Sequence, residues 1–144
     1  MPHAYVDGSY NVSTKRFGYG IVLFTDAYNA DGTPQEIRMS KAFSHDELAE
    51  MRNVAGEIMG AAQAMKTAKA LGLKELTIYH DYEGIAKWCT GEWKTKKEWT
   101  KKYKAFYDEI SQDITVTFQK VEAHSGNQYN DIADKLAKEA VGNK

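Results

Sequence analysis

The chain has 144 residues of uniform composition, which predicts a single domain over residues 1–144 with enough length to bury a core. Its 19 Lys and Arg residues nearly balance its 20 Asp and Glu residues, so a polyanion must be bound by a local patch and not by bulk charge. The single cysteine, Cys89, excludes an internal disulfide and a thiolate zinc cluster. The sequence shows no signal peptide and no membrane-spanning apolar stretch, so we expect a cytoplasmic protein that does not associate with a membrane. We also expect a monomer that has no obligatory protein partner.

Three strand patterns open the chain, each separated from the next by a turn. In the first, alternation places Tyr5, Asp7 and Ser9 on one face of the strand. The turns are short, so we expect neighbouring strands to pair as antiparallel hairpins. The three patterns cover residues 3–10, 17–24 and 35–43.

A long helical pattern follows the strands. Residues 44–47 (Ser-His-Asp-Glu) have the spacing of a capping box before it, and the pattern ends near Leu71, in front of Gly72. The order βββαβααβα results, which predicts an α/β fold with a five-stranded mixed sheet flanked by helices. The later elements are a short strand around residues 76–79, helices over 83–90 and up to about 110, a strand over 114–121 and a helix over 127–141.

Four acidic residues lie in four separate predicted elements. Asp7 is in the first strand, Glu57 in the long helix, Asp81 at the carboxyl end of the fourth strand and Asp134 in the last helix. Carboxylates are the hard oxygen ligands that Mg²⁺ prefers. If these elements converge, the four acids form an oxygen cage of the kind that supports metal-assisted hydrolysis of phosphodiesters.

Each acid also has a simpler interpretation when it is taken alone. Asp7 and Glu57 could be surface side chains at the margin of a buried face. Asp81 lies between a strand and a helix, where an aspartate is most often a helix cap. Asp131 and Asp134 are alternatives in the last helix, and either could be solvated and inert.

The joint pattern resembles a known family, the type 1 ribonucleases H. The matching strings are YVDGSY, MRNVAGE, TIYHDYEGIAKW and VEAHSGNQYNDIADKLAKEA, which follow the family's order and cover nearly the whole chain. The likeness is nearest to bacterial catalytic domains that elsewhere carry an amino-terminal hybrid-binding module. The resemblance implies one RNase H catalytic domain with an RNase H-like fold.

The resemblance also implies roles for individual residues. The four acids become the catalytic, metal-binding carboxylates, with Asp134 preferred over Asp131 because it alone fills the family's Ala-Asp-x-Leu-Ala position. His124 becomes a mobile-loop residue that assists protonation or product departure, although a single histidine on a loop is more often structural. The expected contacts to the RNA strand and its 2′-hydroxyl groups are Gly8, Ser9, Asn53 and Glu83.

The implied reaction is endonucleolytic hydrolysis of the RNA strand of an RNA/DNA hybrid, which leaves 3′-hydroxyl and 5′-phosphate ends. Four carboxylates can share two Mg²⁺ ions about 3.5–4 Å apart astride one phosphate, with Mn²⁺ as a substitute ion. Carboxylates packed together repel, so we expect raised pKa values and a fold that metal stabilises. Discrimination between RNA and DNA would depend on the 2′-hydroxyl and on the wide minor groove of an A-like duplex.

A lysine-rich segment offers the local positive charge that the substrate needs. Residues 87–104 hold seven Lys against two Glu, a net charge of +5, with Trp88, Trp93 and Trp99 interleaved. The simpler interpretation is a solvated charged face, with Trp88 and Trp99 anchoring the core. We favour phosphate contact for the lysines, although this segment is shorter than the long basic handle helix of the family's best-known bacterial members. The lysines expected to hold the DNA strand are Lys94, Lys96 and Lys97.

Two other functions are compatible with the same pattern. A transposase- or resolvase-like DNA nuclease would use clustered acids on the same fold. A non-catalytic hybrid-binding protein would need the positive patch alone. The contexts of Asn53 and His124 favour the ribonuclease over the first, and the complete acid set argues against the second, since mutual repulsion has no structural benefit without metal.

Overall fold

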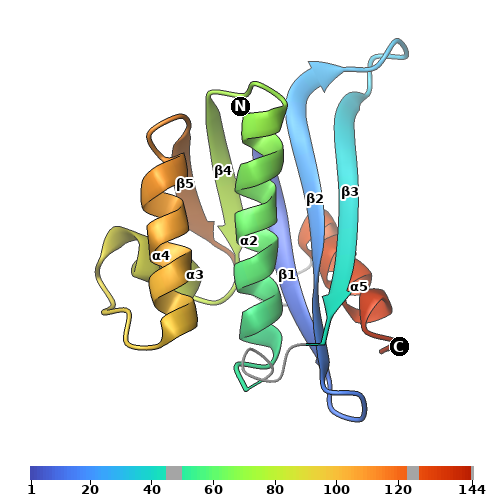
Figure 1. Ribbon diagram of the computed structural model, residues 1–144. Coiled ribbons are helices and arrows are strands. Elements are labelled where there is room, and N and C mark those ends of the chain that lie inside the picture. The colour runs from blue at the N-terminus through green and yellow to red at the C-terminus, as the bar shows by residue number, and fades with distance from the viewer. Residues whose placement is uncertain (45–49, 123–126, 144) are drawn as a thin grey trace.

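The computed structural model describes residues 1–44, 50–122 and 127–143, and its element order confirms the predicted βββαβααβα arrangement (Figure 1). The strands are β1 (His3–Asn11), β2 (Arg16–Tyr28), β3 (Pro34–Phe43), β4 (Glu75–His80) and β5 (Thr115–Lys120). The helices are α2 (Asn53–Ala70), α3 (Gly84–Thr90), α4 (Glu98–Ile110) and α5 (Gln128–Ala140).

The five strands form one mixed sheet in the order β3-β2-β1-β4-β5. Strands β3, β2 and β1 are antiparallel, as predicted, whereas β1 pairs with β4 and β4 with β5 in parallel. Helices α2, α3 and α4 cover one face of the sheet, and α5 covers the other (Figure 1). Because β1 and β4 are parallel neighbours, their carboxyl ends emerge at the same edge of the sheet.

The register of β1 and β4 brings two of the predicted acids together. Tyr5 lies opposite Tyr79 in this parallel pair. Two residues farther along each chain lie Asp7, still within β1, and Asp81, just beyond the end of β4. Side chains alternate with a period of two, so Asp7 projects from the same face of β1 as Tyr5, and Asp81 follows at the carboxyl end of the neighbouring strand.

Glycines let α2 approach the strands very closely. A Cβ atom added at Gly56 of α2 would overlap the backbone oxygen of Gly18, and one added at Gly8 of β1 would overlap the backbone oxygen of Asn53. The absence of side chains at these positions therefore brings the first turns of α2 onto β1 and β2. This explains the glycine at position 56 of α2 and places Glu57, the residue after it, beside β1.

Helix α2 begins later than the sequence pattern predicted. Arg52 has a φ angle of 53°, in the left-handed region, and such a residue cannot continue a right-handed helix. The predicted capping box extends over residues 45–47, which lie outside the described part of the chain. None of the described helices is long and apolar enough to cross a membrane.

Candidate active site

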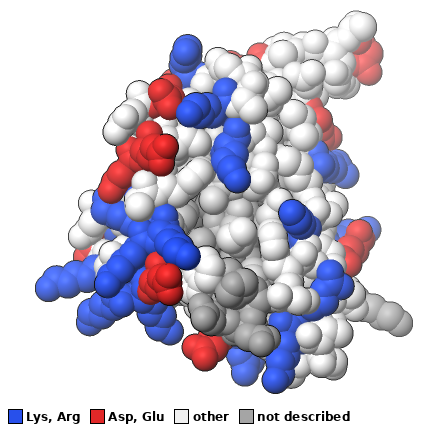
Figure 2. Space-filling model, viewed as in Figure 1, with Lys and Arg blue, Asp and Glu red and all other residues white. Residues whose placement is uncertain are grey.

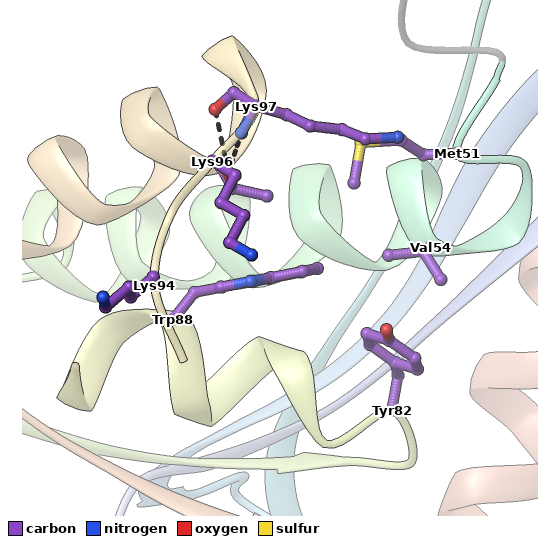
Figure 3. A pocket seen from close by; sticks show the side chains of 8 residues that line it. Met51, Val54, Tyr82, Trp88, Lys94, Lys96 and Lys97 are labelled. Atoms are coloured by element: carbon purple, nitrogen blue, oxygen red, sulfur yellow. Dashed lines mark hydrogen bonds between the residues drawn. The ribbon is translucent and has the colours of Figure 1, made fainter. Parts of the chain in front are cut away.

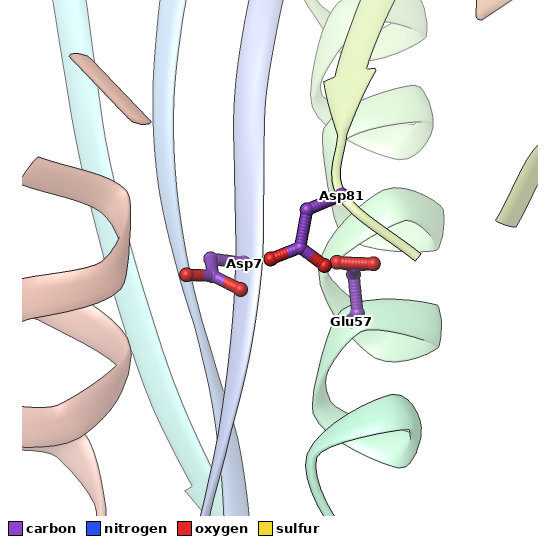
Figure 4. A group of neighbouring side chains, drawn as sticks. All are labelled: Asp7, Glu57 and Asp81. Atoms are coloured by element: carbon purple, nitrogen blue, oxygen red, sulfur yellow. The ribbon is translucent and has the colours of Figure 1, made fainter. Parts of the chain in front are cut away.

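Three of the four predicted carboxylates converge at one point. Asp7 comes from β1, Glu57 from α2 and Asp81 from the turn after β4, and their side chains point toward one another (Figure 4). One oxygen of each lies within 4.8 Å of the others. We call these three residues the acid cluster. Of the four acids expected to meet at one point, these three do so.

Hydrogen bonds hold the acid cluster in place. The backbone N–H of Tyr82 donates to Oε1 of Glu57 at 3.0 Å, and the backbone N–H of Gly8 donates to Oδ1 of Asp7 at 2.9 Å. Glu57 is only 2% exposed and Asp7 only 8% exposed, so neither is a surface side chain. Asp81 is not the cap of α3, because the residue before that helix is Glu83.

Burial and mutual repulsion make the acid cluster unfavourable in its ionised form. Burial, together with the neighbouring carboxylates of Asp81 and Asp134, raises the pKa of Asp7 to about 8. Burial likewise raises the pKa of Glu57 well above its usual range, with further repulsion from Asp81 and Asp7. Among the described residues, none of the ion pairs involves the three acids.

The chemistry of the acid cluster fits a hard divalent cation. All of its ligand atoms are carboxylate oxygens, the donors that Mg²⁺ and Mn²⁺ take in proteins. A cation would supply the missing counter-charge and favour the ionised carboxylates. The raised pKa values agree with the sequence-based expectation of acids that need metal to stay ionised together.

Asp134 lies at the edge of the acid cluster and not within it. It is close enough to Asp7 to raise the pKa of that residue through a hydrogen bond and through charge. Its own carboxylate pairs with Nζ of Lys138 at 2.9 Å, and its side chain is 22% exposed. The alternative acid, Asp131, is exposed in the first turn of α5. The preference for Asp134 over Asp131 therefore agrees with the position of the two side chains.

A hollow beside the acid cluster collects most of the residues expected to contact RNA. It has a volume of about 360 Å³, and its lining includes Gly8, Ser9 and Asn53 together with Asp134. Arg52 and Lys138 line it as well, and the sequence analysis missed both. The i, i+4 spacing from Asp134 was the available signal for Lys138.

A second hollow, of about 350 Å³, gathers the predicted DNA-strand lysines on the other side of the first turn of α2. Figure 3 shows Lys96 above the ring of Trp88 and Lys97 extending toward Met51. In Figure 2, Lys and Arg side chains gather over the segment before α4, at the lower left. We call this hollow the lysine pocket, lined by Met51, Val54, Tyr82, Trp88, Lys94, Lys96, Lys97 and Thr100.

Trp88 belongs both to the core and to the lining of the lysine pocket. Trp88 is 9% exposed and packs in the main hydrophobic core, so the prediction of a core anchor is confirmed for it. The same ring also lines the lysine pocket. Trp93 packs edge-on against Trp88 at 5.8 Å between ring centroids, and Lys102 lies over the ring of Trp99 at 4.5 Å.

One predicted substrate contact, Glu83, lines neither of the two hollows. Glu83 is exposed and pairs with Nζ of Lys87 at 2.8 Å, in a separate hollow that Lys120 also lines. Its proximity in sequence to Asp81 does not bring it to the hollow with Asn53. His124 belongs to residues 123–126, which the structure does not describe.

The fold and the acid cluster together define a protein of the RNase H-like class. A sequence model of the RNase H family matches residues 2–142, nearly the whole chain. Two ribonucleases H, from Francisella philomiragia and Francisella tularensis subsp. novicida, are each 31% identical to this chain over 150 residues, covering 96% of this chain and 89% of theirs. The chain therefore belongs to the RNase H family, and the prediction of a type 1 ribonuclease H is confirmed.

Solved structures agree with this assignment at the level of the fold. RNase H1 from the halophilic archaeon Halobacterium salinarum NRC-1 has a TM-score of 0.76 at 21% identity, covering 98% of this chain and 97% of its own. LC11-RNase H1, solved in complex with an RNA/DNA hybrid, has a TM-score of 0.71 at 16% identity, covering 98% and 99%. The predicted five-stranded RNase H-like fold is thereby confirmed.

Proposed function

We propose that this ribonuclease H cuts the RNA strand of RNA/DNA hybrids internally, using two Mg²⁺ ions and leaving 3′-hydroxyl and 5′-phosphate ends. The observation that carries the proposal is the convergence of Asp7, Glu57 and Asp81 in a buried cluster with Asp134 at its edge. Membership of the RNase H family and the hybrid bound by the similar LC11-RNase H1 support the choice of substrate.

The three carboxylates of the acid cluster would hold the ions, and Asp134 would act as a fourth ligand at its edge. When bound, the ions supply Lewis-acid activation of water and of the scissile phosphate and neutralise developing charge. The protein's own contribution is to fix the acids: the Tyr82 N–H orients Glu57, and the Gly8 N–H orients Asp7. Mn²⁺ would serve as a substitute for Mg²⁺ because it takes the same ligands.

The two hollows would divide the recognition of the duplex. Gly8, Ser9 and Asn53 line the hollow beside the acids, where backbone and amide groups can read a 2′-hydroxyl as donor or acceptor. The lysine pocket would bind phosphates of the DNA strand through charge. Glu83 would contact the substrate once its ion pair with Lys87 opens on binding.

His124 would assist protonation or product departure, as the resemblance implies. Replacing it with alanine should slow the reaction without abolishing it, by roughly a hundredfold if it acts in proton transfer. An unchanged rate for His124→Ala would remove His124 from the mechanism.

We further propose that the enzyme acts as a cytoplasmic monomer, which gel filtration with light scattering and cell fractionation would test.

One assay separates the proposed function from its rivals. The substrate is a DNA duplex with four consecutive ribonucleotides in one strand, incubated with the protein in Mg²⁺ and, in parallel, in EDTA. RNA-strand cutting in Mg²⁺ alone supports the proposal. Cutting of an all-DNA duplex would favour a transposase- or resolvase-like nuclease, and binding without cutting would favour a non-catalytic hybrid-binding protein.

A further inference from the structure

His80 is a buried histidine at the end of β4, directly before Asp81, and it is only 1% exposed. Its Nδ1 lies 2.9 Å from the backbone oxygen of Tyr82. A carbonyl oxygen only accepts hydrogen bonds, so Nδ1 must carry a hydrogen and donate it. This holds whether the ring is neutral or charged, because Nδ1 is protonated in one neutral tautomer and in the cation.

Side chains form hydrogen bonds with both backbone groups of Tyr82, the N–H and the carbonyl. Its N–H donates to Glu57 of the acid cluster at 3.0 Å, and its carbonyl accepts from His80. Asp81 lies between His80 and Tyr82, in a turn that belongs neither to β4 nor to α3. The backbone that carries Asp81 is therefore fixed by the hydrogen bond from the ring of His80 and by the hydrogen bond to Glu57.

The other ring nitrogen of His80 makes histidine less favourable at this buried position than an apolar side chain of the same volume. Within the described part of the chain, Nε2 is buried and has no hydrogen-bond partner. A buried polar atom without a partner costs free energy, so a leucine or phenylalanine would fill the same volume more favourably. The ring of Phe118 packs against this side chain in a T-shaped arrangement, with ring centroids 5.9 Å apart. The hydrogen bond from Nδ1 is thus the feature that an apolar side chain could not replace.

We propose that His80 is a positioning residue, which fixes the turn at residues 80–82 so that the Asp81 carboxylate stays within reach of Asp7 and Glu57. The inference rests on the metal site of the proposed function and assigns no proton transfer to His80. Side chains that orient metal ligands from behind typically change metal affinity or activity by about 10- to 100-fold when they are removed.

Three substitutions separate this role from packing. Asn at position 80 places an amide N–H where Nδ1 lies, Gln places its amide one bond farther from the backbone, and Leu has no donor. We expect His80→Leu and His80→Gln to weaken Mn²⁺ binding by about tenfold, and His80→Asn to stay within about threefold of wild type. Calorimetric titration of the metal-free protein with Mn²⁺ measures the affinity without any dependence on turnover.

Kinetics and spectroscopy complete the test. At saturating metal the KM for hybrid should be unchanged in all three variants, whereas the metal concentration for half-maximal rate should rise in the Leu and Gln variants. The ring ¹H–¹⁵N spectrum of wild type should show a protonated Nδ1 that is protected from exchange. If His80→Leu does not fold, the Asn and Gln pair decides alone.

Equal Mn²⁺ affinity in the Asn and Gln variants, at whatever level, would overturn the positioning role, as would a spectrum with hydrogen on Nε2 only. If wild type binds Mn²⁺ and the variants at position 80 weaken this binding as expected, but wild type cuts no hybrid, the proposed function is overturned and the positioning role stays intact. A wild-type protein that binds no divalent ion would overturn both.

Discussion

The acid cluster and the lysine pocket both gather like charges, but only the acid cluster does so out of water. Glu57 and Asp7 are buried and their pKa values are raised, whereas the lysine pocket is an open hollow whose ammonium groups reach solvent. Like charges in low dielectric repel strongly, and like charges in water repel weakly. We therefore expect the acids to act as one unit that depends on metal, and the lysines to act as separate, salt-sensitive contacts.

The largest expected effect is the loss of turnover when the acid cluster loses one charge. Asp81→Asn and Asp7→Asn keep the shape of the side chain and remove a ligand charge, so kcat should fall by about a thousandfold or more, the equivalent of several kcal/mol. Affinity for hybrid in Ca²⁺ or EDTA should stay near that of wild type. Steady-state cleavage of a labelled hybrid and a binding titration measure the two quantities.

The control for this experiment is Asp131→Asn, the same chemical change at an exposed position on α5. Its kcat should stay within about threefold of wild type, since surface substitutions have small effects. Near-wild-type rates in either cluster variant would refute the assignment of the acid cluster as the catalytic centre. A large loss in Asp131→Asn would instead extend the functional acids along α5.

The second effect is stabilisation of the fold by metal. An ion that binds only the folded state adds RT ln(1 + [L]/Kd), about 2.7 kcal/mol at 100 times Kd. Urea denaturation in Mg²⁺ and in EDTA should show this gain for wild type and a much smaller gain for Asp7→Asn. In EDTA at neutral pH the variant should be more stable than wild type, because folding of wild type must either bury an ionised Asp7 carboxylate beside Asp81 or protonate it, and an amide avoids both costs. A variant that is less stable in EDTA would show that burial and repulsion of the Asp7 carboxylate do not dominate the metal-free cluster.

Much of the fold and of the acid cluster could be predicted from the sequence, because both depend on periodicity and strand direction. Alternation placed Asp7 on the correct face of β1, and the end of β4 was recognised before Asp81. The offset of Asp134 from the cluster could not be predicted, since it depends on how α5 packs against the sheet. Only tertiary contacts reveal that Met51 and Val54 of the distant α2 region complete the lysine pocket.

The third effect is a dependence of stability on pH that comes from the acid cluster. The pKa of Asp7 is raised to about 8 in the folded state, so the metal-free folded protein binds more protons than the unfolded chain between about pH 4 and pH 8. Stability in EDTA should therefore fall as the pH rises through this range. Asp7→Asn should flatten that slope, and Mn²⁺ affinity of wild type should rise with pH as protons leave the acids.

Denaturation curves at half-unit steps from pH 5 to pH 9 measure the slope. Lys138, which pairs with Asp134 at the edge of the cluster, offers a comparison: Lys138→Met changes charge at the rim and should alter the slope less than Asp7→Asn. A metal-free stability that rises steadily over this range would mean that Asp7 is ionised in the folded protein, and the contrast with the lysine pocket would disappear.

The smallest effect is expected in the lysine pocket, where each charge contributes separately. Lys96→Ala with Lys97→Ala should weaken hybrid binding by roughly tenfold at 0.1 M salt and reduce the slope of log K against log salt by about 0.9 for each lost phosphate contact. Because such contacts bind ground state and transition state alike, KM should rise while kcat stays within about threefold. Lys74→Ala is the matched control for each single substitution, Lys96→Ala or Lys97→Ala: it removes one positive charge from an exposed residue just before β4, at the opposite end of that strand from Asp81. An equal change of slope in that control would show that total charge, and not the lysine pocket, attracts the substrate.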